Sequence, residues 1–237
     1  MTISSDIVFL VDVDNTLLDT DRVTADLRQY LFDTFGPEFR DRYLALLEQR
    51  SRALGCPDFF GALQECRRER QGEVRLMELS SWLLDYPFAE RLYPHALNVL
   101  DRFRGWGQTV ILSDGDAVFQ PRKIARSGIR AAVNGHVLIY IHKEEMLAEI
   151  ARRYPARHYV QVDDKLRILS AVKRAWGQQV TTVFARQGRH AHDPRVLTAN
   201  PPADVAVAAI GDLLQFDLPV LLGGRQAPGA HALVGSG

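Results

Sequence analysis

Residues 7–20 read IVFLVDVDNTLLDT, and this stretch decides the fold. An apolar run that begins at Ile7 leads directly into Asp12 and Asp14. A short apolar run that stops abruptly at polar residues is typical of a buried strand in a parallel sheet. In open α/β sheets, ligands bind just outside the carboxyl ends of such strands. Two carboxylates about 4 Å apart there would repel by roughly 4 kcal/mol at an effective dielectric constant near 20, so a cation or a shared proton must offset the repulsion.

The length and composition of the chain allow one large domain, or one core with an inserted subdomain. Its 237 residues are 46% hydrophobic, which is enough to build a full core. The 29 basic residues balance the 29 acidic residues, and no basic run stands out. This balance argues against nucleic acid or a membrane surface as a partner, whereas a small anionic ligand needs only local positive charge.

Cysteine usage and the N-terminal sequence indicate the cytoplasm. Cys56 and Cys66 are the only cysteines, and two thiols without a His cluster favour a reducing compartment over a disulfide scaffold. The N-terminus shows no secretory signal, and no apolar run approaches the length of a membrane span. We expect a cytoplasmic globular protein that is either a monomer or a homodimer.

Several further stretches resemble the first predicted strand, and segments with helical periodicity lie between them. Apolar residues recur every three to four positions in 146–154 and again in 166–176. Strands that alternate with helices indicate an α/β fold with a doubly wound parallel sheet, a Rossmann-like core. The further predicted strands are 109–112, 137–141, 159–162, 180–185 and 205–208.

One interval, residues 21–88, breaks this alternation because it contains no convincing strand. It shows amphipathic helical patterns that are separated by Gly and Pro residues, and a simple crossover needs far fewer residues. We predict that 21–88 is an inserted, all-helical cap subdomain above the end of the first strand. The core then comprises 1–20 and 89–222, and the Gly- and Ala-rich segment 223–237 is expected to be a flexible tail.

Polar residues follow the ends of four predicted strands, and a parallel sheet brings such ends to one edge. Carboxylates there suit a hard cation such as Mg²⁺, and a cation leaves coordination positions for a phosphate. A hydroxyl, backbone amides and an ammonium group can bind the remaining phosphate oxygens. The residues are Asp12 and Asp14, then Ser113, Asp114 and Gly115, then His142 and Lys143, and finally Asp163 and Asp164.

These segments, taken in order, resemble the four motifs of the haloacid dehalogenase-like hydrolase superfamily. The motifs are DVDNT at 12–16, ILSDGD at 111–116, Lys143, and VQVDD at 160–164. The resemblance covers about residues 7–185, and the helical insertion matches the cap that lies between the first two motifs in one large branch.

The resemblance implies a role for each of these residues. Asp12 would be the nucleophile that takes the phosphoryl group as an aspartyl phosphate. Asp14 would protonate the leaving group and then deprotonate the attacking water. Ser113 and Lys143 would hold the transferring group together with the amides of Asp114 and Gly115. The implied Mg²⁺ site comprises Asp12, Asp14, Asp163 and Asp164.

Two details of the motifs bear on the subtype. The true dehalogenases of the superfamily lack the second Asp of the first motif, so the presence of Asp14 favours phosphate over halide chemistry. The fourth motif has no Gly before Asp163 and no acid four or five residues later, where Arg167 and Ile168 stand. Asp164 is then the second acid, which leaves open whether Asp163 or Asp164 contacts the metal directly.

Other residues with a chemical character receive structural interpretations. We expect Lys123 to be exposed on the helix after the second motif, and Lys165 to open the helix after the fourth. A solvated loop is expected to carry His190 and His192, because no third soft ligand accompanies them. We predict surface positions for Arg186 and Gln187. Phe59, Phe60 and Trp82 are expected to pack between the helices of the cap, and both cysteines are expected to have structural roles.

The leading functional prediction is a Mg²⁺-dependent phosphatase of a small phosphorylated metabolite. The alternative is a phosphomutase or phosphotransferase that uses the same aspartyl phosphate, since cap residues decide whether water or a second hydroxyl attacks. A catalytically silent binding protein is a further alternative. A signalling receiver module is disfavoured, because such modules are much shorter and place their paired acids after the first strand.

Overall fold

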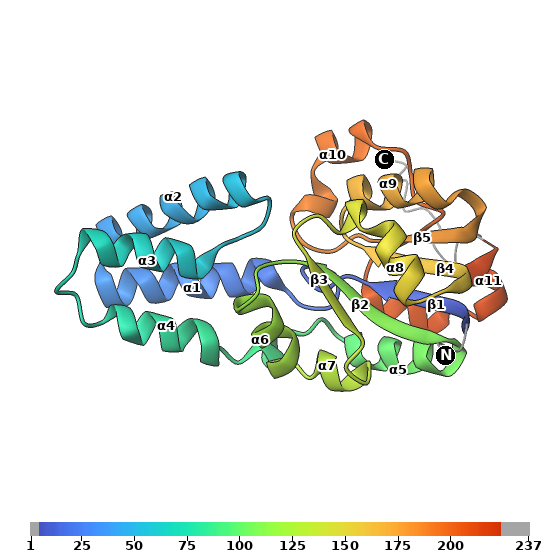
Figure 1. Ribbon diagram of the computed structural model, residues 1–237, viewed down its shortest axis with the longest axis horizontal. Helices are drawn as coiled ribbons and strands as arrows, with labels where there is room; N and C mark the ends of the chain where they lie inside the picture. Colours follow the sequence, from blue (N-terminus) through green and yellow to red (C-terminus); the bar gives the residue numbers. More distant parts are fainter. Residues whose placement is uncertain (1–4, 224–237) are drawn as a thin grey trace, which may run out of the picture.

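A parallel sheet of six strands forms the centre of the protein (Figure 1). The computed structural model describes residues 5–223, and the sheet has the order β3-β2-β1-β4-β5-β6. The α/β prediction is confirmed, and each predicted strand is present, with its ends shifted by no more than three residues. The strands are β1 (Ser5–Val11), β2 (Gln108–Asp114), β3 (Val137–Tyr140), β4 (Ala156–Asp163), β5 (Val180–Ala185) and β6 (Val205–Val207).

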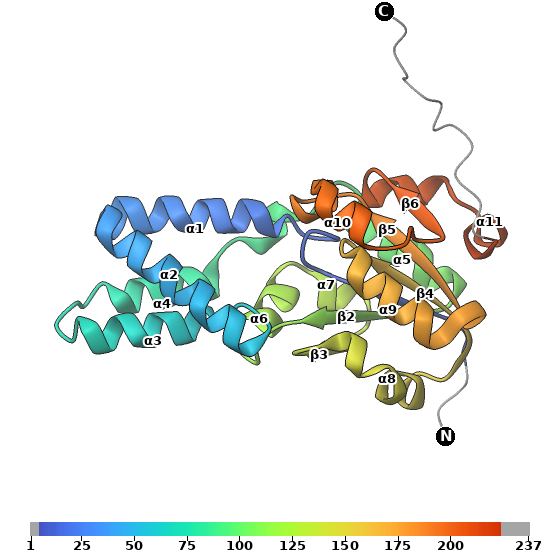
Figure 2. The same cartoon turned by 90° about the horizontal axis from the view of Figure 1, so that it is seen from above.

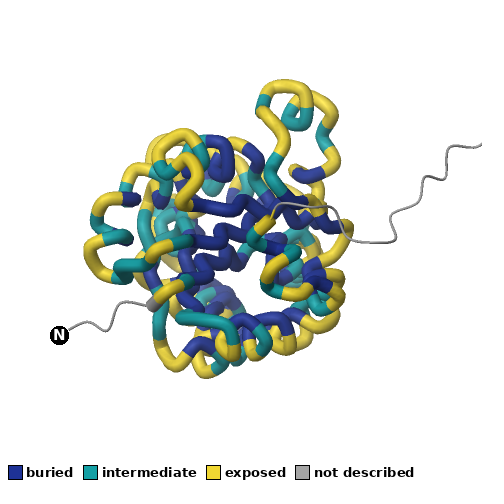
Figure 3. Tube along the Cα trace, turned by 90° about the vertical axis from the view of Figure 1, so that its right-hand side faces the viewer, coloured by how far each residue is buried: buried dark blue, intermediate teal, exposed yellow. Residues whose placement is uncertain are grey.

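Helices cover both faces of the sheet, which explains why β1 is apolar along almost its whole length. Successive side chains of a strand point to opposite faces. Val8 and Leu10 pack into one buried cluster, while Phe9 and Val11 pack into another. The first cluster includes residues of α8 (Leu147–Arg153) and α9 (Leu166–Trp176); the second includes α5 (Ala96–Trp106), α6 (Phe119–Arg126), α7 (Ile129–Ala132) and α11 (Leu218–Leu222). Figure 3 shows the buried strands inside a more exposed shell.

Short helices occupy several of the connections between these elements. They are η2 (Lys143–Glu145), η3 (Gly177–Gln179), η4 (His190–His192), α10 (Pro194–Ala199) and η5 (Ile210–Gln215). Within residues 5–223, no helix combines the length and the hydropathy that crossing a membrane requires. Of the predicted tail, 223–237, only Gly223 belongs to the described residues.

Four helices between β1 and β2 extend away from the sheet (Figures 1 and 2). Asp19 and Asp58 cap two of them by accepting hydrogen bonds from the amides of Arg22 and Gly61, which are otherwise unpaired at a helix start. Gly36, with φ of +86°, separates the first two helices, and Pro37 begins the second. The four are α1 (Thr20–Phe35), α2 (Pro37–Leu54), α3 (Phe59–Glu69) and α4 (Leu76–Asp85), followed by η1 (Phe88–Arg91).

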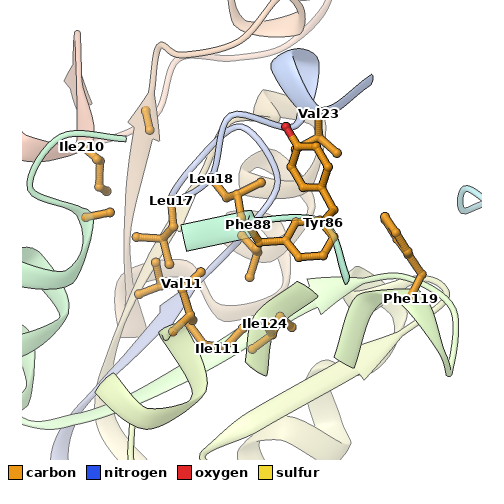
Figure 4. Packing of buried hydrophobic residues seen from close by; sticks show 14 of the residues in the cluster. Val11, Leu17, Leu18, Val23, Tyr86, Phe88, Ile111, Phe119, Ile124 and Ile210 are labelled. Carbon is orange, nitrogen blue, oxygen red and sulfur yellow. The ribbon is translucent and has the colours of Figure 1, made fainter. Parts of the chain in front are cut away.

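Aromatic side chains join this helical insertion to the core. Phe88 lies between them, and its ring centroid is 5.0 Å from that of Tyr86 and 5.6 Å from that of Phe119 on α6 (Figure 4). Phe59 packs on the same Phe119 ring at 4.4 Å. Trp82 stacks on a tyrosine of α1. The predicted packing role of these aromatics agrees with the contacts, and the hydrophobic core runs from the sheet into the insertion without a break.

Truncation of a core residue of β1 tests this packing. Leu10 is fully buried, so we expect Leu10→Ala to lower the free energy of unfolding by about 2–5 kcal/mol, through lost transfer energy and an unfilled cavity. Met77 on α4 is 75% exposed, and Met77→Ala should change the free energy of unfolding by no more than about 0.5 kcal/mol. Urea unfolding followed by circular dichroism measures both. Equal losses in the two variants would contradict the described core.

Candidate active site

A buried ammonium group joins the carboxyl ends of β1 and β4. Lys143 Nζ lies 2.5 Å from Asp12 Oδ1 and 2.7 Å from Asp163 Oδ2, and it also donates to Leu112 O at 3.3 Å. The side chains of Lys143, Asp12 and Asp163 are no more than 2% exposed. The structure therefore brings together residues of all four motifs, which lie far apart in the sequence.

The local turn after β1 orients Asp12. Its amide donates to Val162 O at 3.0 Å, which extends the pairing with β4 by one residue beyond the strand. Thr16 Oγ then donates to Asp12 Oδ2 at 3.1 Å. Asn15, with φ of +57°, lets the chain turn sharply here, and the amides of residues 16–18 all donate to Val13 O. The DVDNT sequence thus forms a compact turn that fixes the first aspartate at the edge of the sheet.

Burial and mutual charge dominate the electrostatics of this cluster. Burial raises the pKa of Asp12, and the nearby Lys143 ammonium opposes that shift without cancelling it. Burial alone would lower the pKa of Lys143, but the carboxylates of Asp12 and Asp163 outweigh it and raise the value. Burial, followed by the charges of Asp12 and Asp163, raises the pKa of Asp164 to about 9. The site therefore holds more buried carboxylate than its ammonium groups neutralise.

The same carboxylates fit a divalent cation. Asp12, Asp163 and Asp164 each offer one oxygen, and the three oxygens lie within 4.8 Å of one another. Both oxygens of Asp164 are buried and accept no hydrogen bond from the described residues. Unpaired buried carboxylate oxygens are costly, and an all-oxygen set is what Mg²⁺ prefers. The chemistry of the donors thus agrees with the metal that the sequence predicts.

Asp14 lies in a separate network, not in that group of three carboxylates. Lys123 Nζ pairs with Asp14 Oδ1, Thr20 Oγ donates to the same oxygen, and Gln120 Nε2 donates to Oδ2 at 2.8 Å. Burial raises the pKa of Asp14, but Lys123 and Thr20 lower it by more, so the carboxylate form is favoured. The Asp14 side chain remains 23% exposed and so stays accessible. Its predicted part in the metal site stays a prediction.

Lys123 is buried, contrary to the prediction of an exposed lysine. It is on the helix after the second motif, as expected, but it is only 2% exposed. The ion pair with Asp14 compensates for the cost of burying the ammonium. The partner is 109 residues away, so local periodicity could not reveal the pair. The one local signal is the spacing of Gln120 and Lys123, which places two polar side chains on one helical face.

The second motif contributes Ser113 and the residues after it. Ser113 is fully buried, and its Oγ accepts a hydrogen bond from Gln120 Nε2 at 2.8 Å. Asp114 Oδ1 accepts the amide of Lys143 at 2.8 Å and so anchors the third motif. The Gly115 amide donates to Tyr140 O at 2.9 Å. This hydrogen bond continues the pairing of β2 with β3, and the predicted contact of the Gly115 amide with a phosphate stays a prediction.

Lys165 is a further cation near the cluster. It directly precedes α9, as predicted, and its amide donates to Asp163 Oδ1 at 2.9 Å. Burial alone would lower the pKa of its ammonium group, but the carboxylates around it, Asp12 foremost, outweigh burial and raise the value. The positive charge of Lys165 therefore adds to that of Lys143 at this edge of the sheet.

Five of the remaining predicted positions agree with the structure, because three are exposed and two are buried thiols. Arg186, His190 and His192 are exposed. Both cysteines are buried and unpaired, and burial raises the pKa of the Cys66 thiol to about 11, which keeps it unreactive.

Gln187 is the exception among these positions, because it is only 6% exposed. Its side-chain oxygen accepts the amide of Ile210, and its Nε2 donates to Thr16 O at 3.4 Å. The prediction of a surface position was wrong, since these partners come from distant parts of the chain. Gln187 ties the turn after β1 to the loop after β6.

Comparisons with known proteins agree with this geometry. The family model of the haloacid dehalogenase-like hydrolases matches residues 8–175. A haloacid dehalogenase-like protein of Burkholderia xenovorans LB400, known from its crystal structure, is 56% identical; the match covers 91% of this chain and 98% of that one, with a TM-score of 0.86. No curated protein matches the chain.

Two more distant structures share the fold. L-2-haloacid dehalogenase from Xanthobacter autotrophicus is 17% identical, with a TM-score of 0.58 over 87% of this chain and 96% of its own. The magnesium-bound HAD-hydrolase YfnB from Bacillus subtilis is 16% identical, with a TM-score of 0.59 and the same coverage of 87% and 96%. The family model covers most of the chain, and the arrangement of its motifs is present in the structure. The chain belongs to the haloacid dehalogenase-like hydrolases.

Proposed function

We propose that this protein is a Mg²⁺-dependent phosphatase that acts on a small organic phosphate through an aspartyl-phosphate intermediate. The observation that carries the proposal is the pairing of two differently held aspartates on one turn. Asp12 lies between an ammonium group and two further carboxylates, whereas Asp14 lies in its own network two residues later. Nucleophilic phosphoryl transfer needs one carboxylate that attacks and a second group that moves protons.

The first step transfers the phosphoryl group to Asp12. A carboxylate oxygen of Asp12 attacks the phosphorus atom, and the bond between phosphorus and the leaving oxygen breaks. The electron pair of that bond goes to the leaving oxygen, which takes a proton from Asp14 when its basicity requires one. The Lys143 ammonium, 2.5 Å from Asp12, stabilises the negative charge that gathers at the transferring group.

The second step releases phosphate. A water oxygen attacks the phosphorus atom of the aspartyl phosphate while Asp14 accepts a proton from that water. The bond between phosphorus and the Asp12 oxygen breaks, so that Asp12 returns as a carboxylate and inorganic phosphate leaves. Asp14 passes this proton to the leaving oxygen of the next substrate, or releases it to solvent when the leaving group needs none, and the cycle balances.

The Mg²⁺ ion would be held by Asp12, Asp163 and Asp164. When bound, the cation would supply the positive charge that this excess of carboxylates and a phosphate dianion require. The exposed fraction of Asp164 is only 1%, and burial without a partner is costly for a carboxylate. Because Lys143 already contacts Asp12 and Asp163, Asp164 is the carboxylate that most depends on the cation.

We propose that the helical insertion acts as a cap. It follows the turn that carries Asp12 and Asp14, and Gly55 at the end of α2 lies against the ring of His142, the residue before Lys143. An added Cβ at Gly55 would lie 2.2 Å from that ring, so the approach is close. We propose that this insertion bounds the substrate-binding space and selects a small phosphorylated metabolite.

Substitution of the nucleophile tests the activity. Wild-type protein should release phosphate from para-nitrophenyl phosphate in Mg²⁺, and Asp12→Asn should lower kcat by on the order of 10³-fold or more, since it removes the attacking oxygen. Asp6→Asn is a matched control on the same strand, because the Asp6 side chain is 82% exposed at the opposite end of β1. Full activity in Asp12→Asn would contradict the proposal.

Product analysis separates this function from its alternatives. Release of free phosphate in stoichiometric amounts indicates hydrolysis, whereas transfer to an added alcohol or an isomerised sugar phosphate would indicate phosphotransferase or mutase activity. A structural relative binds chloropropionic acid covalently as an L-2-haloacid dehalogenase. Chloride release from chloropropionate, with no phosphate release from any phosphate ester, would overturn the phosphatase assignment.

Metal binding is expected to stabilise the fold. At 100 times its dissociation constant, Mg²⁺ should add about 2.7 kcal/mol, a rise of roughly 5–10 °C in the midpoint of thermal unfolding. Asp164→Asn should abolish this rise, because it removes a ligand, whereas Asp101→Asn, whose side chain is 71% exposed, should retain it. Differential scanning calorimetry with EDTA or Mg²⁺ measures the shift. An unchanged shift in Asp164→Asn would exclude the proposed metal site.

A further inference from the structure

Helix α6 carries two deeply buried polar side chains on one face. Gln120 is 3% exposed and Lys123, one turn later, is 2% exposed. Charged and amide side chains are seldom buried to this degree without specific partners. Neither residue belongs to the four motifs of the sequence, and neither has a role in the steps above.

These two side chains contact both oxygens of Asp14. The Lys123 ammonium pairs with Oδ1, and Gln120 Nε2 donates to Oδ2 at 2.8 Å. Since both donors project from one helix, they fix the position of the carboxyl group and the rotation of its plane. An ammonium partner also favours the carboxylate form, which is the form that accepts a proton from water.

Gln120 connects Asp14 to the residue predicted to hold the phosphate. Its Nε2 carries two hydrogen atoms and lies 2.8 Å from both Asp14 Oδ2 and Ser113 Oγ. The space that Gln120 needs exists because residue 115 is glycine. A Cβ added at Gly115 would lie 2.6 Å from Cβ and Cγ of Gln120, closer than carbon atoms can approach.

We propose that Gln120 and Lys123 are positioning residues that hold the Asp14 side chain in place for proton transfer from water in the second step. The inference rests on the proposed function. In that step the water gives its proton to Asp14, its oxygen bonds to phosphorus, and the bond from phosphorus to Asp12 breaks. Lys123 and Gln120 neither give nor take the proton; they act through Asp14.

The consequence is a selective slowing of the second step. para-Nitrophenolate leaves without a proton, so formation of the aspartyl phosphate from para-nitrophenyl phosphate does not depend on Asp14. In Lys123→Met and in Gln120→Leu, which keep the approximate size of each side chain, the intermediate should accumulate. We expect a rapid burst of about one para-nitrophenolate per protein molecule, followed by steady turnover about 10²-fold slower than in wild type.

The kinetic constants give a second readout that a structural defect would not reproduce. When only the second step slows, kcat and KM fall together, and kcat/KM for para-nitrophenyl phosphate is retained. A partly unfolded enzyme would instead lose burst amplitude and kcat/KM in proportion. Gln120→Leu leaves the Lys123–Asp14 ion pair in place, so it keeps the test open if Lys123→Met does not fold.

A double-mutant cycle tests whether Lys123 acts through Asp14. Asp14→Asn should show the same burst, and adding Lys123→Met to it should cause no further fall in kcat. Lys173→Met is the matched control and should behave as wild type. Lys173 Nζ lies 2.8 Å from Asp204 Oδ2, and this ion pair is not part of the acidic cluster.

Each outcome of these measurements decides between the two proposals. A burst with retained kcat/KM in both α6 variants, and no additivity with Asp14→Asn, supports the positioning role. Equal falls in kcat and kcat/KM without a burst, or a burst in Lys173→Met, overturn that role while leaving the phosphatase function intact. Failure of the wild-type protein to turn over para-nitrophenyl phosphate in Mg²⁺ overturns the proposed function, and the inference falls with it.

Discussion

The contact of one buried ammonium group with two carboxylates is the constraint on which the rest of the site depends. Lys143 meets Asp12 and Asp163 with almost no exposure to water, and removing one partner of such a group leaves an uncompensated buried charge. The contact requires that β1 and β4 be neighbours, that β2 pair with both β1 and β3, and that the chain after β3 turn back toward the sheet. The sheet order and the position of Asp12 are therefore linked by electrostatics as well as by hydrophobic packing.

The turn after β1 divides the negative charge of the site into two groups. Asp12 faces Lys143 and the carboxylates of β4, while Asp14 faces Thr20, Gln120 and Lys123. Val13 between them is fully buried and anchors the turn in the core. Because the two carboxylates have different partners, their pKa values shift in opposite directions, upward for Asp12 by burial and downward for Asp14 by its ammonium and hydroxyl partners. The two acids therefore lie in different electrostatic environments although they are only two residues apart.

The sequence contained enough information to predict the sheet, the helical insertion and the motif residues at the ends of strands. Those predictions used signals that lie within about ten residues, such as the apolar run before Asp12. The buried state of Lys123 and Gln187 could not be found in this way, because their partners lie in other parts of the chain. The hydrogen bond from the Gly115 amide to Tyr140 O could not be found in this way either, because it continues the pairing of β2 with β3 and strand order is not visible in local patterns.

Helix α6 contacts both the helical insertion and the acids of the site. Arg122 donates to Leu84 O at 3.0 Å and pairs with Asp85, and Phe119 packs on Phe59 of α3. The same helix presents the side chains that hold Asp14 and Ser113, and the Lys123 ammonium lies 5.5 Å from the centroid of the Phe119 ring. A short helix moves as a unit, since its backbone hydrogen bonds resist internal deformation. Any displacement of the insertion that shifts α6 must therefore also move the partners of Asp14, the residue proposed to transfer protons. The part of the chain proposed to select the substrate and the part proposed to process it are thus both in contact with α6.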